Sequence, residues 1–205
     1  MDTALLRIAE EATGFMPEPE GLALYEAACR VPTGGLICEV GTYCGKSTVY
    51  LAAGARVAGA AVVTVDHHRG SEENQPGWEW HDTSLVDPRT GRLDTLPHLR
   101  RTLETAGVED VVTAVVGRSE QVGRWWSTPA AMLFLDGGHT EAQAQADYEA
   151  WARHVRPGGQ LAVHDVFPDP ADGGQAPYHV VLRALDEGFR EESQVGSLRL
   201  LRRVD

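Results

Sequence analysis

Short apolar runs alternate with segments of helical spacing along most of this chain. Five apolar runs predict strands at residues 36–40, 61–65, 111–116, 131–135 and 160–163. Helical spacing, with caps and breakers, predicts helices at 2–12, 22–31, 46–58, 96–106, 119–126, 144–155 and 180–186. Residues 189–204 are expected to add a C-terminal hairpin with an antiparallel strand. The repeated strand–helix units predict an α/β fold with a doubly wound, mainly parallel sheet.

The polar stretch 67–92 departs from this alternation. It is too long for a plain connection, and loops of this length are usually functional lids or disordered. It carries Trp78 and Trp80 among histidines, carboxylates and amides. We interpret it as an active-site lid, in which each tryptophan either meets a substrate or packs on the base of the lid.

Size and composition favour a single domain over residues 1–205. The 42% of hydrophobic and 23% of charged residues are ordinary for a soluble globular protein, and 205 residues bury a sizeable core. The N-terminal helices, within residues 1–33, are expected to form a cap. This cap either covers a substrate or pairs two copies of the chain, and we favour a homodimer.

Charge and targeting signals restrict the partners. The formal net charge of −12 argues against nucleic acids and anionic membranes as partners. No apolar run is long enough for a bilayer, and the first residues lack a signal-peptide pattern. The three cysteines have no metal-finger spacing and fit a reducing, cytoplasmic location.

A glycine-rich loop follows the first predicted strand, with the sequence Glu39-Val40-Gly41-Thr42-Tyr43-Cys44-Gly45-Lys46-Ser47. Glycines between a strand and a helix let the backbone approach a ligand, and the first amides of the helix then face it. Tyr43 replaces the second glycine of the dinucleotide fingerprint, and the glycine spacing is one residue too short for a P-loop. Asp66, after the second strand, either accepts hydrogen bonds from ribose hydroxyls or caps a helix.

Two later strands end in acids and histidines. One ends in Asp136-Gly137-Gly138-His139, and the next ends in His164-Asp165. The carboxyl ends of neighbouring parallel strands meet at one crevice, so these side chains are expected to converge. Two carboxylates are suited to binding a divalent metal ion, and an imidazole beside them is suited to acting as a base.

In this order, the motifs resemble those of class I S-adenosylmethionine-dependent methyltransferases, which have a Rossmann-like fold. The resemblance is closest to the metal-dependent O-methyltransferases of the catechol, caffeoyl-CoA and macrocin types, and it spans roughly residues 35–166. It rests on the glycine loop, on Asp66, on Gly117-Arg118-Ser119-Glu120 and on the two strand ends.

The resemblance implies roles for these positions. S-adenosylmethionine would lie against Glu39, Gly41, Tyr43, Gly45, Ser47, Asp66, His67, Arg118, Ser119 and Asp136. A divalent ion, Mg²⁺ or alternatively Mn²⁺, would bind Asp136, His164 and Asp165. His164 departs from the family's usual Asp-Asp or Asp-Asn pair, and it either binds the ion, supports the site or bonds to the backbone. His139 takes the place of the proton-accepting lysine of catechol-type relatives and is the expected base, with an N-cap role as the alternative.

The expected reaction is methyl transfer to a metal-activated hydroxyl of a sugar or oligosaccharide. The polar, aromatic lid resembles actinobacterial sugar O-methyltransferases, of the macrocin or methylmannose-polysaccharide type, more than enzymes for flat phenols. The alternatives are a phenol or catechol O-methyltransferase, an antibiotic-tailoring enzyme and a non-catalytic cofactor-binding subunit. The combination of Asp136, His139 and Asp165 argues against the last, because a binding module needs no base beside a metal.

Overall fold

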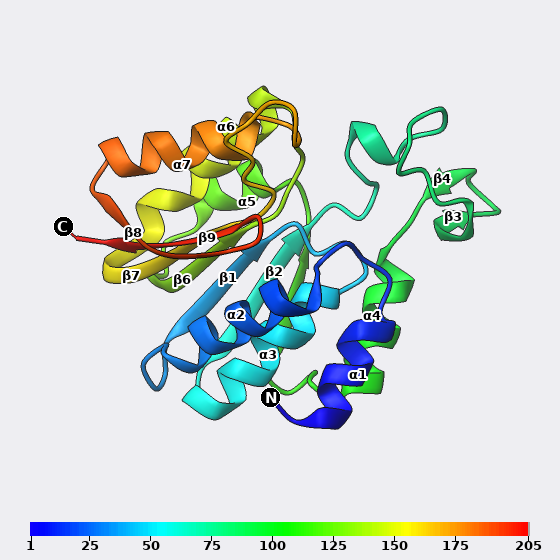
Figure 1. Ribbon diagram of the computed structural model, residues 1–205. Coiled ribbons are helices and arrows are strands. Elements are labelled where there is room, and N and C mark those ends of the chain that lie inside the picture. The colour runs from blue at the N-terminus through cyan, green and yellow to red at the C-terminus, as the bar shows by residue number, and fades with distance from the viewer. Residues whose placement is uncertain (205) are drawn as a thin grey trace.

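A seven-stranded sheet forms the centre of the computed structural model, which describes residues 1–204 (Figure 1). Its strands are β1 (Leu36–Val40), β2 (Ala61–Asp66), β5 (Val112–Val116), β6 (Ala130–Leu135), β7 (Val155–Val163), β8 (Phe189–Val195) and β9 (Leu198–Arg203). The strand order is β5-β2-β1-β6-β7-β9-β8. Within this sheet β9 alone runs opposite to the other six strands, because it pairs antiparallel with both β7 and β8. The α/β fold with its mainly parallel sheet and C-terminal antiparallel strand is confirmed.

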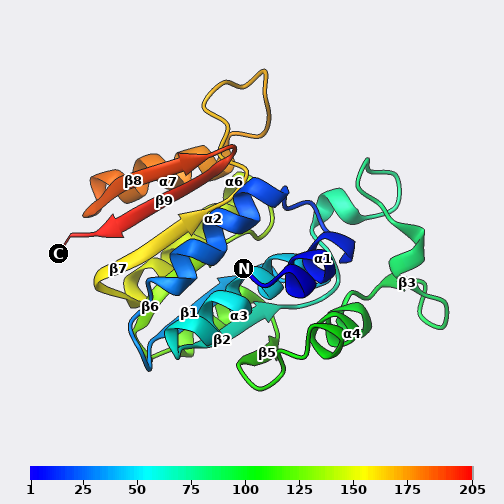
Figure 2. The same ribbon diagram turned by 60° about the horizontal axis from the view of Figure 1, so that its bottom comes forward.

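Helices cover both faces of the sheet (Figure 2). One layer holds α1 (Thr3–Glu11), α2 (Glu18–Cys29), α3 (Lys46–Ala58) and α4 (Leu96–Ala106), and the other holds α5 (Ser119–Trp125), α6 (Glu141–Trp151) and α7 (Ala176–Asp186). In β1, Ile37 packs into the core under the first layer, whereas Cys38 and Val40 pack into the core under the second. Burial on both faces explains why the central strands are mostly apolar.

Several element boundaries differ from those expected, and α6 and α7 begin at Glu141 and Ala176 instead of residues 144 and 180. The second helix begins at Glu18 instead of residue 22, because Pro19 in its first turn has a backbone angle suited to a helix start. Val155, expected on the helix over 144–155, opens β7 instead. Helix α6 ends at Trp151, and Val155 pairs with Ala130 before the register shifts. Gly158, with φ of 71°, lies in the segment that this irregularity adds to β7.

The stretch 67–92 extends away from the sheet beside α4 (Figure 1). It contains two 3₁₀ turns, η1 (Glu72–Asn74) and η2 (Thr83–Leu85). The short antiparallel strands β3 (Val86–Asp87) and β4 (Arg92–Leu93) close its far end. We refer to residues 67–92 as the lid segment. Across residues 1–204, every helix falls short of the length and apolar character that crossing a membrane requires.

Candidate active site

The loop between β1 and α3 is held open by unusual backbone angles. Gly41 has φ of 89°, and a Cβ atom there would lie 1.9 Å from the carbonyl oxygen of Asp136. Only glycine fits this close approach of the loop to the end of β6. Tyr43 also has positive φ, 50°. Asp66 holds the loop, because its Oδ2 accepts hydrogen bonds from the amides of Thr42, at 3.0 Å, and Tyr43, at 2.9 Å.

Glu39 supports the loop from inside the protein. It is fully buried, and its two oxygens accept hydrogen bonds from the hydroxyls of Ser47 and Thr48, each at 2.6 Å. Burial raises the pKa of Glu39 to about 7, against the opposing effect of these hydroxyls. Glu39 and Gly45 do not line the cavity described next. A Cβ atom on Gly45 would instead meet Leu99, at 2.7 Å. The structure therefore places these two predicted cofactor residues behind the loop.

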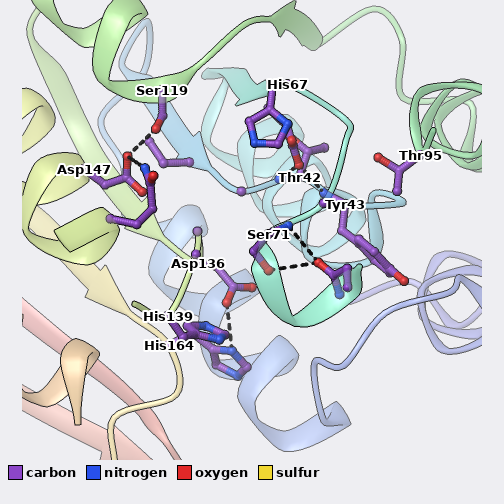
Figure 3. A pocket seen from close by; sticks show the side chains of 18 of the residues that line it. Thr42, Tyr43, His67, Ser71, Thr95, Ser119, Asp136, His139, Asp147 and His164 are labelled. Carbon is purple, nitrogen blue, oxygen red and sulfur yellow. Dashed lines mark hydrogen bonds and ion pairs between the residues drawn. The ribbon is translucent and has the colours of Figure 1, made fainter. Parts of the chain in front are cut away.

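A cavity of about 320 Å³ opens at the carboxyl ends of β1, β2, β6 and β7 (Figure 3). Its volume lies in the range of small-ligand sites. The first residues of α3 line it, and α3 has no side-chain cap on its N-terminus, so its first amides are available to an anionic group. The cavity brings together most of the residues singled out from the sequence: Gly41, Tyr43, Ser47, Asp66, His67, Arg118, Ser119, Asp136, His139, His164 and Asp165.

One corner of the cavity was missed by the sequence reasoning. Asp147, on α6, is buried and accepts hydrogen bonds from the hydroxyl of Ser119 and from Nε2 of Gln143, the latter at 3.1 Å. Burial raises the pKa of Asp147 to about 6 despite these bonds. A sequence signal existed, because Asp147 stands three residues after Ala144 and four before Trp151, on the otherwise apolar face of its helix.

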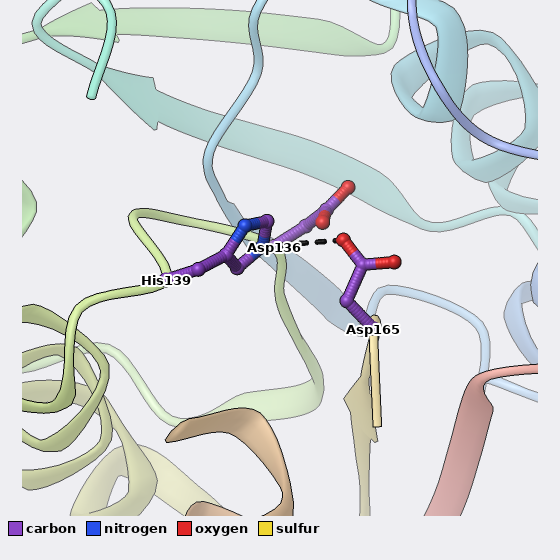
Figure 4. A group of neighbouring side chains, drawn as sticks. All are labelled: Asp136, His139 and Asp165. Atoms are coloured by element: carbon purple, nitrogen blue, oxygen red, sulfur yellow. Dashed lines mark ion pairs between the residues drawn. The ribbon is translucent and has the colours of Figure 1, made fainter. Parts of the chain in front are cut away.

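The acidic end of the cavity gathers Asp136, His139 and Asp165 (Figure 4). One ligating atom from each lies within 4.8 Å of the others, which is close enough for all three to reach one metal ion. Nε2 of His139 lies 3.2 Å from Oδ2 of Asp165, and its Nδ1 lies 3.0 Å from Oε1 of Glu73, in the lid segment. Within the described part of the chain, Nε2 is buried and has no hydrogen-bond partner.

The charges around His139 determine its protonation. Burial alone lowers the pKa of its imidazole, but the hydrogen bond to Glu73 and the charges of Asp165, Glu73 and Asp136 outweigh burial. Together they raise the pKa to about 9. In the absence of a bound cation, His139 is therefore an imidazolium at neutral pH.

His164 is the most enclosed of the predicted metal ligands. It is buried, with Nδ1 3.1 Å from Oδ1 of Asp136 and Nε2 2.6 Å from Oε2 of Glu20. Burial acts to lower its pKa, but Asp136, Asp165 and Glu20 outweigh burial and raise it to about 12. Both ring nitrogens thus have carboxylate partners, and His164 lies outside the three-residue group above. Its role as a metal ligand stays a prediction, and the structure shows a support for Asp136.

Aromatic side chains stand beside the glycine loop. Phe15 contacts Tyr43, with ring centroids 5.6 Å apart, and Trp80 of the lid segment, with centroids 5.3 Å apart and the rings edge to face. Phe15, Trp78 and Trp80 are each about half exposed. Phe15 and Trp80 line a second hollow of about 450 Å³, which shares Tyr43 with the main cavity. The structure thus offers exposed aromatic faces next to the cavity.

Comparison with known proteins identifies relatives of this arrangement. A family model described as a methyltransferase domain matches residues 38–166, from β1 through the end of β7. Cofactor-bound Rv0187 from MTB has a TM-score of 0.66 and 22% identity, over 98% of this chain and 88% of that chain. The O-methyltransferase TomG from Streptomyces achromogenes, in complex with SAM, has a TM-score of 0.62 and 19% identity, over 100% and 91%. An O-methyltransferase from Bacillus cereus, in complex with SAH, has a TM-score of 0.66 and 18% identity, over 100% and 92%. At these identities the similarity to the solved structures shows a shared fold.

Proposed function

The chain belongs to the methyltransferase domain family, and from this premise we propose that it methylates a hydroxyl group of a sugar or oligosaccharide with S-adenosylmethionine. One observation carries the proposal: a single cavity joins the glycine loop to the cluster of Asp136, His139 and Asp165. One end suits a cofactor, and the chemistry of the other suits a divalent ion and a base. The two solved O-methyltransferases reported above, one bound to SAM and the other to SAH, support the choice of reaction and cofactor.

The cofactor end fits S-adenosylmethionine by its chemistry. The uncapped start of α3 suits the carboxylate of an amino acid. Asp66 reaches the cavity with a carboxylate that can accept hydrogen bonds from ribose hydroxyls. Asp147 and Ser119 offer polar atoms at another corner of the cavity, and we assign this corner to the adenine. When bound, this cofactor supplies an electrophilic methyl group on a sulfonium, and the residues named here orient it.

The acidic end fits a divalent cation. Asp136 and Asp165 are the oxygen ligands that hard cations prefer, and the unpartnered Nε2 of His139 points into the same space. When bound, such an ion lowers the pKa of an acceptor hydroxyl. Nε2 of His139 faces Asp136 and Asp165 and is the nitrogen that would take the hydroxyl proton. His164 holds Asp136 in place from behind.

The aromatic and polar surroundings support the sugar class. Trp80 and Phe15 present exposed faces, and the lid segment adds hydrogen-bonding groups at the rim of the second hollow. Flat aromatic faces also suit a phenol, so a phenol or catechol acceptor is the second candidate. TomG, named for its part in tomaymycin synthesis, makes the tailoring of an antibiotic a related possibility. The homodimer expected from the sequence stays a prediction.

A methyl-transfer screen tests the proposal. Monosaccharides, oligosaccharides and catechols are incubated with S-adenosylmethionine, with and without EDTA, and calorimetry measures the affinity for S-adenosylhomocysteine. We expect cofactor binding, and methylation of sugar hydroxyls that chelation abolishes. His139→Ala should greatly reduce turnover and leave cofactor affinity intact. Absence of cofactor binding would overturn the whole proposal, activity that survives exhaustive chelation would exclude the metal, and a preference for catechol would replace the sugar.

A further inference from the structure

The lid segment places one carboxylate against His139. Oε1 of Glu73 lies 3.0 Å from Nδ1, on the opposite side of the imidazole from Asp165. We propose that Glu73 is a positioning residue, which the lid segment supplies to orient His139 for proton transfer. This inference rests on the proposed role of His139 as the base and adds the element that controls it.

The two nitrogens of His139 have different surroundings. Glu73, as a carboxylate, only accepts hydrogen bonds, so its contact favours a proton on Nδ1. Asp165 lies farther away, 3.2 Å from Nε2, and does not form a hydrogen bond with it. A neutral imidazole has a single N–H, and the lone pair is then left on Nε2. Nε2 is the buried atom without a hydrogen-bond partner among the described residues, and it faces the carboxylates of the metal cluster. Glu73 therefore directs the reactive nitrogen toward the place where an acceptor hydroxyl would bind.

Glu73 is itself held by a short, well-bonded turn. Its neighbours Ser71 and Asn74 form a capping box, in which the Ser71 amide donates to Oδ1 of Asn74 at 3.0 Å. The Ser71 hydroxyl lies 3.0 Å from Oε1 of Glu73. Nε2 of Gln75 donates to the carbonyl oxygens of Arg69 and Ser71, at 2.9 and 3.0 Å. These bonds hold the turn together, and the Ser71 hydroxyl also holds the carboxylate of Glu73.

The turn that carries Glu73 lies directly against the loop that carries His139. A Cβ atom on Gly138 would lie 2.9 Å from Cγ of Gln143 and 3.6 Å from Cβ of Ser71. The distance to Ser71 is an ordinary van der Waals contact and places the two segments against each other, whereas the closer approach to Gln143 of α6 explains the glycine at position 138. Any movement of the turn away from this loop would take Glu73 away from Nδ1. Orientation of the base is therefore coupled to the closed position of the lid segment.

Hydrogen exchange on the ligand-free protein tests this coupling. Glu73→Ala and His139→Ala should each accelerate exchange of amides 72–75 about tenfold, because each removes the same charge-assisted contact. The double variant should exchange no faster than either single variant. Glu72→Ala removes an equal charge from an exposed position in the same turn and should leave the exchange unchanged. Additive acceleration, or none, would overturn the coupling.

Nitrogen NMR of ¹⁵N-histidine-labelled protein tests orientation separately from packing. Glu73→Ala should shift the Nδ1 resonance of His139, and Glu73→Gln, which keeps an oxygen acceptor, should restore it. An Nδ1 resonance that is unaffected by Glu73→Ala would overturn the positioning role. Calorimetry with S-adenosylhomocysteine on the wild-type protein is the separate check of the proposed function. Failure to bind it would refute methyl transfer, whereas the exchange and NMR results report on Glu73 alone.

Discussion

The two ends of the cavity are held by different kinds of interaction. At the glycine-loop end, two consecutive backbone amides donate to Asp66, and a third, of His68, donates to its other oxygen at 2.7 Å. At the acidic end, carboxylates pair with imidazoles that come from distant parts of the chain: Glu20 with His164, and Glu73 with His139. The first end depends on backbone conformation, and the second on long-range assembly of charged side chains.

The largest effect is expected from breaking the buried pair at the acidic end. Glu20 accepts hydrogen bonds from Nε2 of His164, at 2.6 Å, and from the amide of Ser197, at 2.9 Å. Glu20→Ala leaves the buried imidazolium with fewer partners, and such a loss typically costs about 3–5 kcal/mol. We therefore expect the free energy of unfolding, measured by urea denaturation, to fall by this amount. Glu26→Ala, at an exposed position on the same helix, is the control and should change stability by less than about 0.5 kcal/mol.

A side chain added within the glycine loop should lower the stability of the protein and disrupt cofactor binding. Gly41→Ala brings a Cβ atom within 1.9 Å of the Asp136 carbonyl oxygen at a residue with φ of 89°. Overpacking and backbone strain together should lower stability by about 3 kcal/mol and abolish binding of S-adenosylhomocysteine. Gly34→Ala is the matched control, because Gly34 has φ of 75° with no atom within 4 Å of the added Cβ. The Gly34→Ala variant should lose only the stability that the backbone strain costs, and it should keep full cofactor affinity. Equal losses of stability and of cofactor affinity in the two variants would contradict the close approach of Gly41 to Asp136.

The difference between local backbone conformation at one end of the cavity and long-range side-chain pairing at the other also determines which features the sequence could predict. The strands, the glycine loop and Asp66 follow from local patterns, because apolar runs and glycines determine backbone conformation over a few residues. The convergence of Asp136 and Asp165 followed from the rule that parallel strands end at one edge. Glu20 and Glu73 were missed, since nothing near them in the sequence indicates that they meet His164, 144 residues away, or His139. A contact of that kind depends on how α2 and the lid segment pack.

The third prediction concerns the pH dependence that Glu39 gives the glycine-loop end. Its folded-state pKa, about 7, lies above the ordinary value of 4.5, so the folded state binds the proton more tightly. This contribution to stability is complete below pH 4.5 and is lost as pH rises through 7, with a total of about 3 kcal/mol. Relative to Glu39→Gln, the wild-type protein should thus lose stability over this pH range in urea denaturation. Glu26→Gln should show no such difference, and a flat comparison for Glu39→Gln would mean that Glu39 ionises normally.

The smallest predicted effect tests whether the acidic end binds a divalent ion. Mg²⁺ or Mn²⁺ at ten times its dissociation constant should stabilise the folded protein by about 1.4 kcal/mol, and EDTA should reverse the gain. Asp165→Asn is suited to this test, because asparagine tolerates the positive φ of 54° at this position while it removes the ligand charge. The variant should fold, bind S-adenosylhomocysteine normally and lose the metal-dependent gain. Asp172→Asn, in an exposed loop, should keep it. A gain that persists in Asp165→Asn would place the ion elsewhere and leave the pairing of carboxylates with imidazoles as a purely structural feature of this end.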